Sequence, residues 1–182
     1  QSTSVTFSAQ AALTAGTHTV KVWVSEVNGV AETITTDDMA TTVVYVASQV
    51  VTRNALIEEF TSSTCNPCAA LNVSFDPLLQ TNNPNSGGRV NVIKYQMDWP
   101  APGNDPSYNP EGDTRKTFYN VGGIPDAWTN GINNMSAHNQ AEIDAAKAEA
   151  AYANITATIN VTGNQITASS TITPFLTISS GS

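Results

Sequence analysis

The sequence is poor in charge and has no long hydrophobic run. Of its 182 residues, 15 are acidic and only 7 are basic, so the net charge is -8. That balance opposes non-specific attraction to nucleic acid or to an anionic membrane surface, and we expect neither as a partner. The longest apolar run near the start, residues 43–47, has the length of a strand and not the roughly 20 residues of a membrane-spanning helix. We therefore expect no transmembrane segment in this chain.

Targeting features are also missing from the beginning of the sequence. Gln1 is followed by neither the charged region nor the apolar core of a signal peptide, so we expect any such segment or earlier domain to have been removed or to lie outside this sequence. Thr, Asn and Ser are abundant, Lys and Glu are scarce, and Thr alternates with Val. This composition is typical of β-rich extracellular proteins.

What the first 50 residues do contain is the alternation typical of strands. It predicts strands at 4–8, 17–27 and 41–47. A sandwich normally needs about seven strands, so we interpret 1–50 as a partial β-sandwich. The pattern of residues 13–22 resembles the last strands of bacterial immunoglobulin-like adhesion modules.

A second β-segment is predicted at the other end of the chain. Residues 153–182 alternate apolar and polar side chains on both sides of Gly163-Asn164. This pattern predicts a β-hairpin that opens a further β-domain.

Between these segments the pattern changes to strand, turn, helix and strand, at 55–60, 65–80 and 89–97. This βαβ order predicts an α/β central domain over 54–152. Four apolar residues of the helix share one face and should contact the sheet: Leu71, Phe75, Leu78 and Leu79. A later Ala-rich helix is predicted from a cap at Ser136 to about residue 152.

Residues 98–113 contain four Pro, two Gly and three Asp. This composition predicts a long inserted loop before a short helix at 114–121. The loop has enough oxygen-bearing side chains for Ca²⁺, but their spacing fits no EF-hand, so a solvated acidic loop is favoured. His18 and His138 share no motif, and we predict neither a metal nor a cofactor.

Cysteine is nearly absent, and the only two lie three apart, at Cys65 and Cys68, where a strand gives way to a helix. That spacing lets both sulfurs meet in the first helical turn. The helix N-terminus favours a thiolate, and CxxC motifs lower the pKa of the first cysteine to about 7 or below. We therefore predict Cys65 as the nucleophile and Cys68 as the resolving cysteine.

The motif Cys65-Asn66-Pro67-Cys68 resembles that of the thioredoxin superfamily. The preceding residues 56–60 resemble the central strand of that family, and Glu59 matches the position of its buried proton-accepting acid. The resemblance implies that Glu59 accepts the proton of Cys68; the alternative is that Glu58 or Glu59 points to solvent. Asn66 and Pro67 are predicted to belong to the substrate-binding surface.

Downstream, residues 119–125 resemble the segment that carries the cis-proline of the superfamily. The resemblance implies a cis Ile124-Pro125 bond close to the cysteines, with Ile124 and Pro125 binding an extended substrate chain. Thr64 stands where the family commonly has Trp, and about 60 residues separate the motif from Pro125. Both departures leave the choice of substrate open.

Taken with the flanking β-segments, the chain is most similar to outer-membrane-associated thioredoxin-like proteins of Bacteroidetes. This resemblance implies an extracytoplasmic location in the periplasm, at the outer membrane or on the cell surface. Its partners would be protein thiols or disulfides, or neighbouring cell-surface proteins. Thiol-disulfide exchange is the favoured function, with its redox direction open. The alternative is a structural or adhesive module in which the cysteines form a permanent disulfide.

Overall fold

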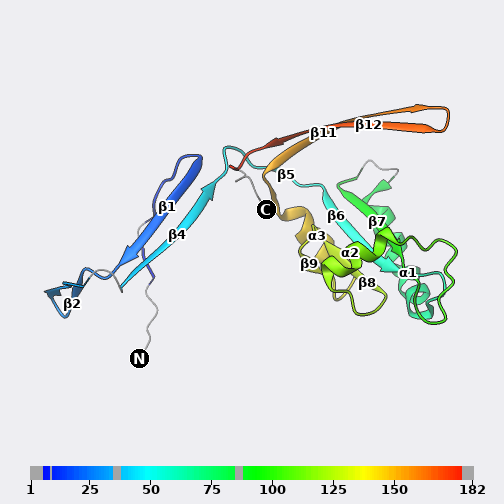
Figure 1. Cartoon of the computed structure of the whole chain (residues 1–182), viewed down its shortest axis with the longest axis horizontal. Helices are drawn as coiled ribbons and strands as arrows, with labels where there is room; N and C mark the ends of the chain where they lie inside the picture. Colours follow the sequence, from blue (N-terminus) through cyan, green and yellow to red (C-terminus); the bar gives the residue numbers. More distant parts are fainter. Residues whose placement is uncertain (1–5, 9, 35–37, 85–87, 178–182) are drawn as a thin grey trace. The chain divides into compact units, whose positions relative to one another are not determined.

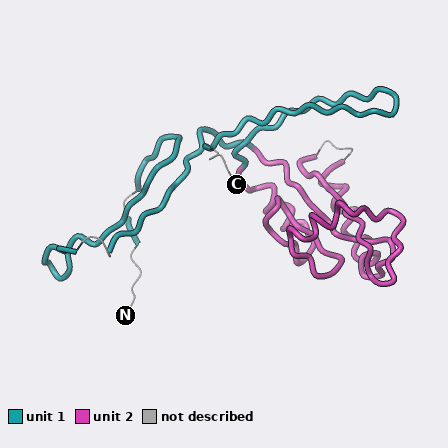
Figure 2. Tube along the Cα trace, viewed as in Figure 1, with its two compact units in different colours: residues 1–51, 151–182 teal, residues 52–150 magenta. Residues whose placement is uncertain are grey.

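A computed structural model describes residues 6–8, 10–34, 38–84 and 88–177. The chain divides into two compact units, one of residues 1–51 and 151–182 and one of residues 52–150 (Figure 2). The predicted central domain, 54–152, and the second unit differ by two residues at each end. Strand β5 (Val51–Thr52) pairs with β10 (Ala150–Ala151) where the chain passes between the units.

The N-terminal part of the first unit consists of two antiparallel hairpins. β1 (Gly16–Trp23) pairs with β4 (Met39–Val46), and β2 (Glu26–Val27) pairs with β3 (Val30–Ala31) (Figure 1). The predicted strand 17–27 is thus divided into β1 and β2. The predicted strand 4–8 is wrong for residues 6–8, which are not in a strand, and its first two residues lie outside the described part.

The C-terminal part of this unit is the predicted hairpin. β11 (Ala153–Thr162) and β12 (Gln165–Pro174) pair in antiparallel register around Gly163-Asn164. Cross-strand pairing places Ile155 opposite Ile172 and Val161 opposite Ile166, which gives the hairpin one largely apolar face. The hairpin is confirmed, and the further β-domain stays a prediction.

The second unit is a mixed α/β structure around a four-stranded sheet of order β7-β6-β8-β9. Its central strand β6 (Ala55–Thr61) runs parallel to β7 (Val90–Gln96) and antiparallel to β8 (Asp126–Thr129), and β9 (Asn133–Asn134) closes one edge. All of β6 except Leu56 is fully buried. A central strand covered on both faces explains why its sequence is nearly continuous in apolar and buried polar residues.

Three helices in the described part of this unit cover the two faces of the sheet: α1 (Asn66–Asn82), α2 (Glu111–Tyr119) and α3 (Gln140–Ala148). Side chains alternate along β6, so Ala55 and Ile57 join the core formed with α1 and α3, whereas Phe60 joins the core formed with α2. The predicted apolar face of α1 lies in the first core, where Phe75 and Leu79 are buried and Leu71 and Leu78 are partly buried. Glu59 therefore shares the face of α1, and Glu58 the face of α2.

Two of the predicted helices have wrong boundaries. α2 begins at Glu111 and not at residue 114, so the irregular part of the insertion ends earlier than predicted. The cap of α3 is Asn139 and not Ser136, because Asn139 and Glu142 form a reciprocal capping box. That helix ends at Ala148 and not near residue 152, because residues 150–151 pair with β5.

Candidate functional site

Cys65 and Cys68 form a disulfide at the start of α1, with their Cα atoms 5.3 Å apart. Cys65 is the N-cap of the helix, and its sulfur accepts a hydrogen bond of 3.2 Å from the backbone N–H of Cys68. Asn66 and Pro67 begin the helix and are exposed. An N–H group aimed at Sγ, together with the helix N-terminus, would stabilise a Cys65 thiolate after reduction.

The segment between α2 and β8 brings Ile124 to this cysteine pair. The Ile124-Pro125 peptide bond is cis, as predicted, and the carbonyl oxygen of Ile124 lies 3.9 Å from Sγ of Cys65. Both residues are half-buried. The two predicted halves of the site, 59 residues apart in sequence, therefore meet in space.

Glu59 lies on the same face of β6 as α1 and is fully buried. Lys94 Nζ lies 2.8 Å from Glu59 Oε2 and 2.5 Å from Asp76 Oδ1. The Glu59 contact is an ion pair by distance, although neither of its carboxylate oxygens receives a hydrogen bond of good angle within the described residues. Burial raises the pKa of Glu59, and the pairing with Lys94 only partly offsets this effect. A solvent-facing Glu59 is therefore ruled out.

Lys94 also connects this carboxylate to a polar row on α1. Cys68, Asn72 and Asp76 recur at intervals of four and so follow one another along the helix. Lys94 Nζ lies 3.5 Å from Oδ1 of Asn72, and Asn72 lies one helical turn after Cys68. Lys94 was not predicted from the sequence. A signal was present, because Lys94 falls on the same side of its strand as the apolar residues Val90 and Val92.

Glu58 is also buried, contrary to the alternative that it points to solvent. Arg115 donates two hydrogen bonds of 2.6 and 2.7 Å to its carboxylate, and Tyr95 donates a third of 3.0 Å. Tyr119 donates a fourth. Burial works to raise the pKa of Glu58, but these bonds from Arg115, Tyr119 and Tyr95 outweigh it and leave the pKa lowered. The network attaches α2 to the face of the sheet opposite Glu59.

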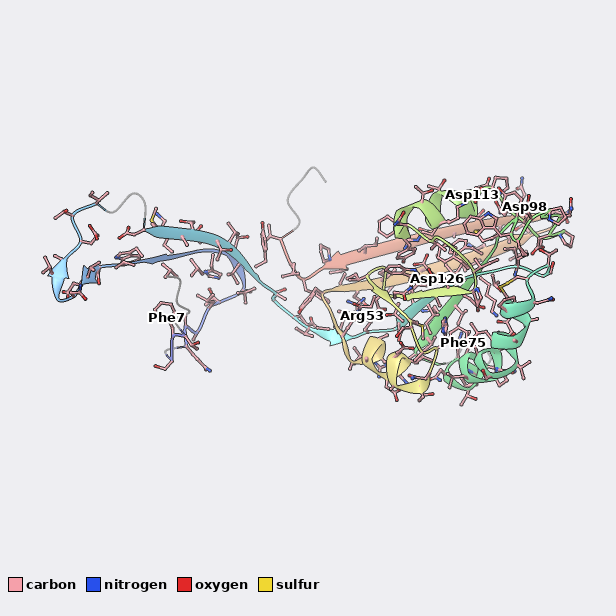
Figure 3. The ribbon with its side chains drawn as sticks, turned by 90° about the horizontal axis from the view of Figure 1, so that it is seen from below. Phe7, Arg53, Phe75, Asp98, Asp113 and Asp126 are labelled. Atoms are coloured by element: carbon pink, nitrogen blue, oxygen red, sulfur yellow. A yellow bond between two sulfur atoms is a disulfide. The ribbon has the colours of Figure 1, made fainter. Side chains whose placement is uncertain are left out.

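The insertion at 98–113 lies against the turn before the cysteines. Asp105 accepts hydrogen bonds of 2.8 Å from the backbone N–H groups of Ser63 and Ser107, and Thr64 Oγ1 donates one of 3.1 Å to the carbonyl of Trp99. Figure 3 labels Asp98 and Asp113 at the two ends of the insertion. The predicted solvated acidic loop is therefore wrong for Asp105, which is buried.

The part of the chain that the structure describes also bears on three other features: a metal site, a membrane-spanning helix and a cavity. No three His, Cys, Asp or Glu side chains gather there as a group able to hold a metal. No described helix is long and apolar enough to cross a membrane. A cavity of about 680 Å³ is lined by β7, α2 and the insertion, including Tyr95, Arg115 and Phe118, and neither cysteine lines it.

Comparison with known proteins leaves the family of this chain open. No protein-family model matches it, and no curated protein does. The crystal structure of a protein from Agrobacterium tumefaciens, determined by a structural genomics consortium, is similar over part of its length, with 19% identity and a TM-score of 0.46. The alignment covers 64% of this chain and 55% of that one. The chain's own structure shows a mixed α/β protein with a disulfide at a helix N-terminus.

Proposed function

We propose that this protein carries out thiol-disulfide exchange outside the cytoplasm, through a thioredoxin-like site. The observation that carries the proposal is the Cys65–Cys68 disulfide at the N-terminus of α1, with Cys68 N–H donating to Cys65 Sγ. A disulfide suits an oxidising compartment, and the Thr-rich composition is typical of β-rich extracellular proteins. The resemblance to outer-membrane-associated proteins of Bacteroidetes adds the periplasm or cell surface as the expected location.

In the reducing direction, a Cys65 thiolate attacks one sulfur of a substrate disulfide. A mixed disulfide forms on Cys65, and the other substrate sulfur leaves as a thiolate. The Cys68 thiol then loses its proton and attacks Cys65 Sγ, which restores the Cys65–Cys68 disulfide and releases the second substrate thiolate. Two electrons pass from the protein to the substrate, and the oxidising direction is the reverse.

Glu59 is the proposed acceptor of the Cys68 proton. Its burial favours the protonated carboxyl, and Lys94 provides a charge that stabilises the carboxylate between cycles. The Ile124 carbonyl lies beside Cys65, and Ile124 and Pro125 would bind the backbone of an extended substrate, while Asn66 and Pro67 are exposed next to Cys65. The expected partners are protein thiols or disulfides.

A second function is favoured by one observation: Cys65 is only 3% exposed and Cys68 is fully buried. A disulfide so covered also suits a structural or adhesive surface module, in which it would be permanent. Neighbouring cell-surface proteins would then be the partners.

Reduction of insulin by dithiothreitol distinguishes the two functions. A redox-active site predicts that catalytic amounts of the wild type accelerate insulin precipitation above the rate with dithiothreitol alone. Cys65→Ser should abolish this acceleration, and Asp144→Asn, an exposed change on α3, should retain it. Rates equal to dithiothreitol alone for all three proteins would favour the structural module.

A further inference from the structure

Cys65 is buried although the residues next to it in the turn are exposed. Thr64, Asn66 and Pro67 on either side of it are exposed, yet Cys65 itself is 3% exposed. The side chain therefore points inward from an exposed turn. A thiol that is to attack Sγ must pass whatever flanks this turn.

One flank of the turn is the 98–113 insertion, and it is attached at two consecutive residues. Ser63 N–H donates to Asp105 Oδ2 at 2.8 Å, and Thr64 Oγ1 donates to the Trp99 carbonyl at 3.1 Å. The attachment points are the two residues immediately before Cys65. These two hydrogen bonds hold the insertion next to the disulfide.

Asp105 is the central group of this attachment. Its side chain is buried. One carboxylate oxygen accepts a hydrogen bond from the backbone N–H of Ser63 on the turn, and the other accepts one from the backbone N–H of Ser107 within the insertion. Hydrogen bonds to a carboxylate are among the stronger ones in proteins, and they are more costly to break when the acceptor is buried. Burial works to raise the pKa of Asp105, but the N–H groups of Ser107 and Ser63 outweigh it and leave the pKa lowered.

The insertion is also held in shape by its own contacts. Asp98 Oδ1 accepts from Asn104 N–H at 2.7 Å, and Gly103 between them has a φ of +81°. A Cβ at Gly103 would lie 2.3 Å from Asp98 Oδ1, so only glycine fits this turn. Trp99 packs against the core shared with Ile124, and Lys116 Nζ lies 4.6 Å from the centre of its ring.

We propose that Asp105 is a positioning residue that fastens the 98–113 insertion over the approach to Cys65, so that the insertion restricts which thiols and disulfides reach the sulfur. This inference rests on the proposed exchange function. Substrates would enter along the other flank, beside Ile124 and Pro125, as extended chains. Release of the insertion at Asp105 would widen the approach from the turn side.

The test follows stoichiometric reduction of the protein's own disulfide by dithiothreitol. One dithiothreitol thiolate attacks Cys65 Sγ, and Cys68 leaves as a thiolate that takes up a proton. The second dithiothreitol thiolate then closes the cyclic disulfide and releases Cys65, so two electrons move to the protein. Because attack requires local opening, the rate should rise about tenfold or more in Asp105→Ala.

Four further variants sharpen this measurement. Thr64→Val removes the second attachment and should accelerate reduction by a smaller factor. Asp144→Ala removes the same charge from an exposed site on α3, and Ile143→Val loosens the buried core of α3; both should leave the rate within about twofold, because neither touches the insertion. Asp105→Asn keeps one acceptor oxygen, so its disulfide should be reduced at a rate between those of the wild type and Asp105→Ala. This variant preserves the test if Asp105→Ala does not fold.

Equal reduction rates for the wild type, Asp105→Ala and Asp105→Asn would overturn the positioning role, as would an equal acceleration in Ile143→Val. These outcomes are independent of the proposed function, because reduction of the protein's own disulfide needs no substrate turnover. If Asp105→Ala is reduced faster but the wild type never accelerates insulin reduction, the shielding stands and the exchange function fails.

Discussion

Glu58 and Glu59 are adjacent on β6, send their carboxylates to opposite faces of the sheet, and are both buried. Glu58 receives two hydrogen bonds from Arg115 and one from each of two tyrosines, whereas among the described residues the Glu59 carboxylate has an ion pair with Lys94 and no hydrogen bond of good angle. The environments shift the two pKa values in opposite directions, down for Glu58 and up for Glu59. One carboxylate is thus suited to hold charge permanently and the other to exchange a proton.

The opposite shifts predict opposite dependences of stability on pH. For Glu59 the folded-state pKa lies above the unfolded value, so its contribution is fully present below the unfolded pKa and is lost as pH rises through the folded pKa. The free energy of unfolding of Glu59→Gln should therefore increase relative to that of the wild type as pH rises from about 4.3 towards neutrality. Urea unfolding of the oxidised proteins between pH 3 and 8 measures this difference.

Glu58→Gln is the matched comparison for that experiment. Its folded-state pKa lies below the unfolded value, so the wild-type contribution is present above the unfolded pKa and is lost as pH falls through the folded pKa. The disadvantage of Glu58→Gln should accordingly shrink in acid, below about pH 4. Parallel curves for Glu58→Gln and Glu59→Gln would contradict the assignment of opposite roles.

Breaking the Glu58 network from its other side should destabilise the domain. Arg115→Met leaves a buried carboxylate with only tyrosine donors, and we expect a loss of about 2 to 4 kcal/mol in the free energy of unfolding, reduced by the partial exposure of Arg115. Asp144→Asn breaks an exposed pair with Lys147 and should cost much less than Arg115→Met. Similar losses in chemical denaturation of the two variants would mean that the buried network contributes no more than a surface pair.

The sequence was sufficient for features that depend on neighbouring residues. The strand, turn, helix and strand order located β6 and β7, the position of Cys65 before a helix located the start of α1, and Gly163-Asn164 located the turn of the C-terminal hairpin. The sequence did not decide the start of α3, because two residues close together there are both suited to cap a helix. Ser136 and Asn139 are both good caps, and Glu142 decides for Asn139 because its carboxylate reaches back to that backbone N–H.

The contacts that attach the insertion and α2 to the rest of the domain could not be predicted from the sequence. Asp105 and Ser63 are 42 residues apart, and Arg115 and Glu58 are 57 apart. Neither partner carries a local pattern that identifies the other, since each pairing depends on how the insertion and α2 return to the sheet. The resemblance to thioredoxins pointed to Glu59 and Pro125, but the insertion is a departure from that family and so had no counterpart to guide its interpretation.

Reduction of the disulfide should lower stability by a modest amount. The Cys65–Cys68 link closes a loop of only four residues, and loop-closure entropy then predicts a loss of about 2 kcal/mol in the free energy of unfolding. Urea denaturation with and without excess dithiothreitol measures the difference, and the Cys65→Ser/Cys68→Ser double variant should match the reduced protein. A reduced protein as stable as the oxidised one would contradict the prediction.

If Cys65 is the attacking cysteine and Cys68 the resolving one, the two single-cysteine variants should react with glutathione disulfide at different rates. In Cys68→Ser, Cys65 remains beside the exposed turn and the Ile124 carbonyl, so glutathione disulfide should leave one glutathionyl group on it that no resolving thiol removes. In Cys65→Ser, the remaining thiol belongs to Cys68, which is fully buried, and adduct formation should be at least about tenfold slower because it requires local opening. Intact-mass measurements over time give both rates. Equal rates would remove the reason for assigning attack to Cys65, whereas a faster Cys68 would reverse the roles of the two sulfurs.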